Sequence, residues 1–98
     1  MSDALTARLA DLAARGQTTS YGALARDLGL RMGELTAALE ALMEEDAALG
    51  RPFRAVVVSA RGSALPARGF FDKAAELGRP AMDQTAFVAG ERKALTRG

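Results

Sequence analysis

Apolar residues recur at helical spacing from the start of the chain. Leu5, Leu9 and Leu12 lie four and three residues apart, which puts them on one face of a helix. This pattern predicts a first helix over residues 3–14. Gly16 suits the left-handed conformation that ends many helices, so the chain is expected to turn there.

Two more helices are predicted before residue 50. Residues 18–20 offer good capping side chains, and the apolar stripe that follows runs from Tyr21 to Leu28 and stops at Gly29. A longer helix is expected over residues 32–48, ahead of a Gly and Pro pair. Its predicted inner face consists of Leu35, Ala38, Leu39, Leu42 and Met43.

The pattern changes after residue 52. Residues 53–59 are rich in β-branched side chains and have the length of a strand. Residues 61–69 carry turn-forming residues and are expected to form a loop or a ragged second strand. A short helix over residues 70–77 and a final helix over about residues 83–95 complete the prediction. Phe87, Val88 and Leu95 are expected to point inward.

Three consecutive helices, with a short second one and a Gly turn before the third, are typical of a helix-turn-helix. The predicted fold is therefore mainly α with a small β element (α+β), a winged helix-turn-helix. It has three N-terminal helices, a strand or hairpin wing, and one or two C-terminal helices. In this interpretation residues 1–98 form one domain, with the helix-turn-helix at 18–48, the wing at 53–69 and the C-terminal helices at 70–95.

The composition removes most catalytic chemistry. The 98 residues include no Cys and no His, so thiolate chemistry, disulfides, the commonest general base and the commonest transition-metal ligands are excluded. Ser59 or Ser63 with Lys73 lacks the context of an activated nucleophile. Glu44, Glu45 and Asp46 are consecutive on a helix and point in different directions, which disfavours a shared cation. We expect no enzyme, no cofactor and no metal.

Targeting signals are also missing from the sequence. The longest apolar run is the short stretch at residues 55–58, and no basic region precedes an apolar stretch at the N-terminus. The expected location is the cytoplasm, without a membrane partner.

Charge is divided unevenly between the two halves of the chain. Residues 1–50 carry four Arg and eight acids, a net charge of −4, and residues 51–98 carry nine basic residues and four acids, a net charge of +5. The basic residues of the second half are Arg51, Arg54, Arg61, Arg68, Lys73, Arg79, Arg92, Lys93 and Arg97. One hypothesis is that Arg51, Arg54, Arg61 and Arg68, around the predicted strand and loop, contact nucleic-acid phosphates, joined after folding by Arg79, Arg92 and Lys93. The alternative is that they pair with the acidic third helix and keep the domain soluble.

The segment from Tyr21 to Leu30 reads Tyr-Gly-Ala-Leu-Ala-Arg-Asp-Leu-Gly-Leu, and Leu35, Leu39 and Leu42 follow at the spacing of a recognition helix. This stretch resembles the helix-turn-helix of small bacterial regulators, over about residues 18–60. The resemblance implies binding to double-stranded DNA through the exposed N-terminal side of the third helix. Of the side chains there, Arg31 is the best suited, and Glu44 and Glu45 disfavour phosphate approach.

The motif Thr18-Thr19-Ser20-Tyr21-Gly22, followed by Leu24-Ala25, is similar to one in the DNA-binding half of O6-alkylguanine alkyltransferases and alkyltransferase-like proteins. The segment Glu91–Leu95 is similar to their closing segment. Their reactive Pro-Cys-His-Arg motif is absent, with Pro52-Phe53-Arg54 at most a remnant, and the third helix has no matching arginine. The resemblance therefore implies no alkyl transfer, and it gives Tyr21 a role in stacking on a base or contacting phosphate. The alternative is that its ring packs inward and its hydroxyl stays wet.

The second half resembles a group of short bacterial proteins that pair a helix-turn-helix with Val-Val-Ser, Gly, Leu-Pro and Gly-Phe-Phe elements. Here these are Val57–Ser59, Gly62, Leu65-Pro66 and Gly69–Phe71. This resemblance implies the fold rather than an activity.

Two functions from different classes follow. The first is a non-enzymatic winged-helix nucleic-acid-binding protein, a small regulator. The second is a protein-interaction module or small inhibitor that uses the acidic third helix and the loop over residues 65–71, where one of two adjacent Phe rings is expected to be exposed. The nucleic-acid candidates are Tyr21, Arg31, Thr36, Arg54, Arg61 and Arg68. The protein-binding candidates are Leu65, Pro66, Phe70, Phe71, Glu44 and Glu45.

Overall fold

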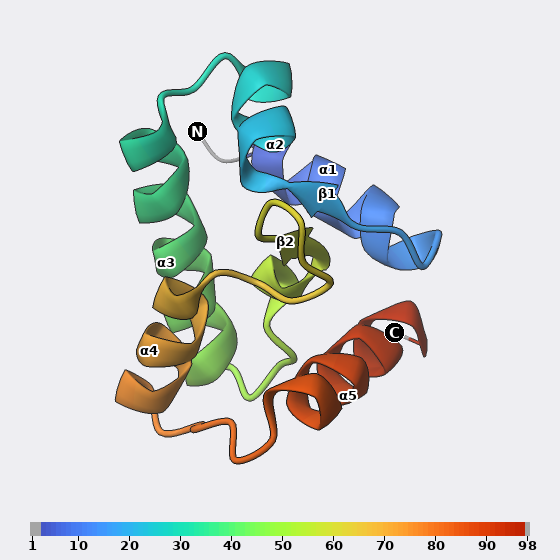
Figure 1. Ribbon diagram of the computed structural model, residues 1–98, viewed down its shortest axis with the longest axis vertical. Coiled ribbons are helices and arrows are strands. Elements are labelled where there is room, and N and C mark those ends of the chain that lie inside the picture. The colour runs from blue at the N-terminus through green and yellow to red at the C-terminus, as the bar shows by residue number, and fades with distance from the viewer. Residues whose placement is uncertain (1–2, 98) are drawn as a thin grey trace.

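The computed structural model describes residues 3–97 and is mainly helical, with a small two-stranded parallel sheet (Figure 1). The elements in chain order are α1 (Asp3–Ala14), β1 (Thr19–Ser20), α2 (Tyr21–Leu28), α3 (Met32–Ala48), the 3-10 helix η1 (Arg54–Val57), β2 (Val58–Ser59), α4 (Arg68–Glu76) and α5 (Gln84–Arg97). No helix within the described residues is both long and apolar enough to cross a membrane.

Local signals place the ends of α2 and the start of α3 where the sequence predicts them. The Ser20 hydroxyl accepts a hydrogen bond from the Ala23 N–H at 3.1 Å and caps α2. Gly29, with φ of 67°, lets the chain leave α2, and the Arg31 N–H donates to Glu34 Oε1 at 2.8 Å at the start of α3. The helices predicted over residues 3–14, 21–28 and 32–48 are confirmed.

The core joins all the helices to the buried segment that contains η1 and β2. Leu5, Leu9 and Leu12 of α1 are buried, as are the predicted inner residues of α3 except Ala38, which is half-buried. Segment 53–59 lies at the centre of this core, and within it only Arg54 is partly exposed. Val88 of α5 is buried in the core, and Phe87 and Leu95 of the same helix are partly buried and pack against it.

The strand predicted over residues 53–59 is confirmed only at Val58 and Ser59. Residues 54–57 form a 3-10 turn instead, and β2 pairs in parallel with β1, with Thr19 opposite Val58 and Ser20 opposite Ser59. Across residues 60–67, which the structure describes in full, the chain forms a loop closed by the Ala60 N–H and the Leu65 carbonyl, 2.8 Å apart, and no second strand. The small sheet therefore joins the segment before α2 to the segment after α3, and residues 53–69 do not form a hairpin.

Both members of the Phe70–Phe71 pair are buried, so the prediction that one of them is exposed is wrong. Adjacent residues point about 100° apart on an α-helix, so burial of both requires cover on more than one face of α4. The Phe70 ring packs edge-on against Phe53 at 5.9 Å and against Phe71 at 5.2 Å, and it lies 6.3 Å from Phe87. These rings join α4 and α5 to the central segment.

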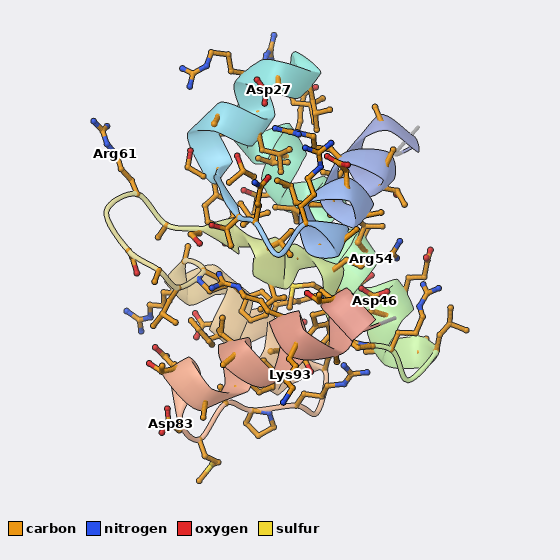
Figure 2. The ribbon with its side chains drawn as sticks, turned by 90° about the vertical axis from the view of Figure 1, so that its right-hand side faces the viewer. Asp27, Asp46, Arg54, Arg61, Asp83 and Lys93 are labelled. Carbon is orange, nitrogen blue, oxygen red and sulfur yellow. The ribbon has the colours of Figure 1, made fainter. Side chains whose placement is uncertain are left out.

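A buried carboxylate holds η1 against the end of α3. Asp46 is 0% exposed, and its oxygens accept the Arg54 backbone N–H at 2.9 Å and the Arg54 Nε–H at 3.0 Å. Arg51 lies 3.2 Å from the same carboxylate. Asp46 and Arg54 are labelled in Figure 2. Because a buried charge is costly without partners, these contacts make Asp46 a fixed point between α3 and segment 51–54.

Replacing Asp46 by Ala should lower the free energy of unfolding by about 3 kcal/mol, because Arg54 then loses its buried partner and the η1 turn loses its acceptor. Urea unfolding followed by circular dichroism at the helix band measures this change. The matched control is Glu45→Ala, which removes the neighbouring, exposed carboxylate that also contacts Arg51 and Arg54. Equal losses for the two variants would contradict the account.

Candidate functional site

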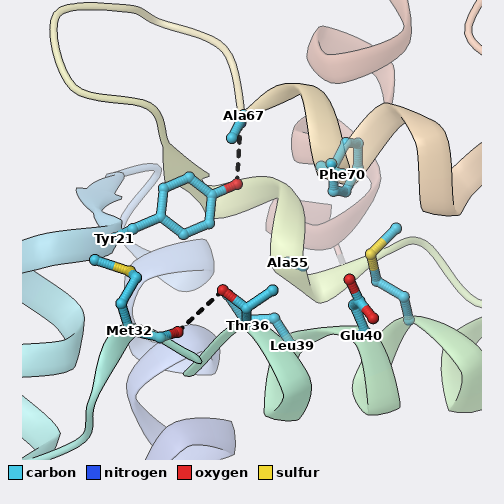
Figure 3. A pocket seen from close by; sticks show the side chains of 10 residues that line it. Tyr21, Met32, Thr36, Leu39, Glu40, Ala55, Ala67 and Phe70 are labelled. Atoms are coloured by element: carbon cyan, nitrogen blue, oxygen red, sulfur yellow. Dashed lines mark hydrogen bonds between the residues drawn. The ribbon is translucent and has the colours of Figure 1, made fainter. Parts of the chain in front are cut away.

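A cavity of about 280 Å³ opens between the start of α2, α3 and the start of α4 (Figure 3). Three segments that are distant in the sequence therefore meet here, with η1 behind them. The lining residues are Tyr21, Met32, Thr36, Leu39, Glu40, Met43, Ala55, Ala67, Gly69 and Phe70. We call this cavity the α3–α4 groove. Its walls are mostly apolar, which is typical of a binding site that excludes water.

Tyr21 lies at the edge of the groove and connects two of the segments that line it. Its hydroxyl oxygen accepts a hydrogen bond from the Ala67 N–H at 3.0 Å, as Figure 3 shows, so the start of α2 is joined to the residue before α4. Burial raises the pKa of the Tyr21 phenol above 10.0, and the Ala67 hydrogen bond offsets part of this effect. Tyr21 is half-buried and packs against the core, as the inward-ring alternative expects, but its hydroxyl oxygen is bonded to the Ala67 N–H, which that alternative did not include.

Two methionines give the groove an adaptable surface. Met32, in the first turn of α3, is 50% exposed and lines the groove opening, and the buried Met43 lines it about three turns further along. Thioether side chains are unbranched and polarizable, so they adjust to the shape of what they contact. The sequence pattern did not mark Met32 as a site residue. Met32 is apolar and lies three residues before Leu35, so it resembles one more position on the inner face of the helix.

Glu40 supplies the only carboxylate among the residues that line the groove. It is half-buried, and its carboxylate stands on the α3 side of the groove in Figure 3. Thr36, one turn earlier, donates its hydroxyl hydrogen to the Met32 carbonyl at 3.0 Å. The groove therefore combines apolar walls with a single negative charge.

The acidic end of α3, which includes the protein-binding candidates Glu44 and Glu45, is largely paired within the chain. Lys73 of α4 reaches Glu44 at 2.6 Å, and Glu45 lies 2.9 Å from Arg54 and 3.0 Å from Arg51. Hydrogen bonds from Arg54 and Arg51 lower the pKa of the Glu45 carboxyl below its usual 4.5. Glu45 and Asp46 thus share the cations Arg51 and Arg54, whereas Glu44 pairs with Lys73, so the three consecutive acids do not converge on one site.

The basic residues of the second half are mostly used internally as well. Arg54 is held by Asp46, and Arg79 lies over the Phe53 ring at 4.4 Å and 3.7 Å from Glu91. Arg92 donates to the Val56 carbonyl at 2.9 Å and to the Ser59 hydroxyl at 3.1 Å. These contacts match the alternative in which the charge asymmetry serves internal pairing.

Other predicted nucleic-acid candidates remain at the surface. Arg68 is 92% exposed, and its one ion-pair contact, with Asp72, is long at 3.9 Å. Arg61 projects from the loop after β2 (Figure 2). Among the side chains that the structure describes, the cations without a carboxylate within 4.0 Å are Arg26, Arg31, Arg61, Arg92 and Lys93. Arg54 is paired with Asp46 and therefore does not join the exposed Arg61 and Arg68 in one basic surface.

The predicted loop candidates lie beside the groove or in it. Phe70 lines it, and Ala67 and Gly69, from the same stretch, line it too. Leu65 is half-buried and Pro66 is buried, so neither forms an exposed apolar patch. The acidic third helix and the loop over residues 65–71, which the sequence interpretation assigned together to a protein-binding module, both contribute residues to this groove.

The chain matches no protein-family model, and comparison with curated proteins and with solved structures gave no match either.

The single tyrosine offers a direct test of the groove geometry. The chain has one Tyr and no Trp, so phenolate absorbance near 295 nm reports on Tyr21 alone. We expect its titration midpoint to lie above 10.0, since burial disfavours the phenolate. Because the folded state then holds the proton more tightly than the unfolded chain, this contribution to stability is present below the unfolded pKa. It is lost as the pH rises through the folded pKa. A midpoint at or below 10.0 would contradict the burial of Tyr21 against Ala67.

Proposed function

We propose that this chain is a protein-interaction module that binds its partner through the α3–α4 groove. The observation that carries the proposal is an apolar cavity of about 280 Å³ that opens to the surface between the acidic α3 helix and the start of α4. Apolar surface gains roughly 25 cal/mol per Å² when a partner removes it from water. Met32, at the opening, is the exposed apolar side chain that a partner would cover.

The charge of α3 supports a protein partner over a nucleic acid. Glu34 and Glu40, which form no ion pair among the described side chains, are at least partly exposed along α3, and no basic residue lies between Met32 and Ala48. The negative potential of this helix repels phosphates and attracts basic protein surfaces. The cations that the sequence assigned to a nucleic-acid face include Arg54, which belongs to η1 and pairs with Asp46 at the end of α3.

Met32→Arg should reduce recovery of the natural partner by about tenfold or more, because it places a charge at the mouth of an apolar binding surface. The matched control is Met82→Arg, at a residue 95% exposed between α4 and α5 and outside the groove. The measurement is quantitative mass spectrometry of proteins crosslinked to each variant in the source cells.

Both variants should keep the melting temperature of the parent chain, since both Met side chains are at least half exposed. A partner that is lost equally with Met32→Arg and Met82→Arg, or with neither, would contradict docking in the groove.

A second candidate function is nucleic-acid binding on a winged-helix scaffold. The observation that favours it is that Arg26 and Arg31, on either side of the short connection between α2 and α3, form no ion pair among the described side chains. This is the part of a helix-turn-helix that approaches the major groove. Arg61 and Arg68, on the loop side, would then contact phosphates.

Fluorescence anisotropy with a random duplex at about 50 and 200 mM salt separates the two functions. The protein-interaction proposal predicts no binding at either concentration. Three phosphate contacts would instead weaken binding roughly 40-fold over this range, and Arg31→Gln with Arg61→Gln would flatten the dependence. That result would replace the first proposal by the second candidate.

A further inference from the structure

Glu40 stands apart from the other acidic side chains that the structure describes. Each of the others has an ion-pair or hydrogen-bond partner within the chain: Asp11, Asp27, Glu34, Glu44, Glu45, Asp46, Asp72, Glu76, Asp83 and Glu91. Glu40 has neither kind of partner among these residues, although it is half-buried in the wall of the α3–α4 groove. Its oxygens still reach solvent, because no buried side-chain oxygen lacks a partner.

This placement selects among the groups that could enter the groove. An anion would be repelled by Glu40, and a neutral apolar group would cover the carboxylate without replacing its hydrogen bonds to water, which is costly. A cation with an apolar stem satisfies both features, because the stem lies along apolar walls while the charged end meets the carboxylate.

The walls favour a flat cation over a compact one. The Tyr21 ring and the Met32 and Met43 side chains line the same groove as Glu40, with Tyr21 and Met32 at the other side of Thr36 in Figure 3. A guanidinium group is planar, stacks on aromatic faces, is less strongly hydrated than an ammonium, and donates two parallel hydrogen bonds to one carboxylate. An arginine side chain therefore fits this groove better than a lysine.

We infer that the α3–α4 groove receives an arginine side chain of a partner protein, whose stem lies along the apolar walls and whose guanidinium group pairs with Glu40. This inference rests on the proposed protein-interaction function and names the group that the groove recognises. The negative charge along α3 and the unpaired Glu40 make the groove complementary to a basic segment.

The test is an amide chemical-shift titration of the whole chain with N-acetyl-arginine methylamide and, in parallel, with its citrulline counterpart. Citrulline replaces the guanidinium by a urea of nearly the same shape, so the comparison isolates the charge and the fork of donors. At constant ionic strength, the arginine compound should shift the amides of Thr36, Glu40 and Gly69 and should bind about tenfold more tightly than the citrulline compound. The lysine compound should fall between them.

Two variants separate Glu40 from general electrostatic attraction. Glu40→Gln should abolish the preference for arginine over citrulline, because it removes the one carboxylate of the groove. Asp72→Asn, which removes the same charge from the exposed side of α4, should leave the preference unchanged. Both variants should keep the parent melting temperature, since neither position is buried.

Equal affinity for the arginine and citrulline compounds, or no shift in the groove with either at about 100 mM, would overturn the inference. The docking proposal would survive that result if Met32→Arg still removed the natural partner, and it would fail with the inference if Met32→Arg had no effect. Shifts of the same amides on simple dilution of the free protein would assign the groove to a second copy of the chain. That would also overturn the inference.

Discussion

The ion pair between Asp46 and Arg54 is the constraint on which the rest of the structure depends. A fully buried carboxylate at the end of α3 needs donors, and it takes them from both the backbone and the side chain of Arg54. The chain after α3 is thereby folded into the η1 turn, which sets Val58 and Ser59 beside β1. The same turn places Ala55 at the back of the α3–α4 groove, so the shape of the groove depends on the contact between Asp46 and Arg54.

The pairing also decides what the charge asymmetry of the sequence means. Arg51, Arg54 and Lys73 neutralise the acidic end of α3, and Arg79 and Arg92 fasten the last two helices to the central segment. The basic residues of the second half therefore serve mainly to form ion pairs and hydrogen bonds within the chain. The remaining part of α3 keeps its acids, and one of them faces an apolar groove without a counter-ion of its own. A surface of this kind suits a basic protein segment better than a phosphate backbone.

The sequence predicts the first three helices well because their apolar spacing and their Ser and Gly ends are local signals. It fails at residues 54–57, where a Val-rich strand pattern is overridden by a contact with Asp46, eight residues away from Arg54. Phe70 and Phe71 were misjudged because their burial depends on rings from segments far along the chain, such as Phe53 and Phe87. The groove could not be predicted as a unit, since it combines the starts of α2 and α4 with the middle of α3.

We propose that the α3–α4 groove, and not the set of exposed arginines, is the binding surface of this chain. Photo-crosslinking in the source cells tests it most directly, with benzoylphenylalanine introduced at the exposed Thr36 of the groove or at the exposed Arg61 of the loop after β2. The account predicts a discrete protein adduct from position 36 and no nucleic-acid adduct from either position. Nucleic-acid adducts from position 61, with no protein adduct from position 36, would contradict it.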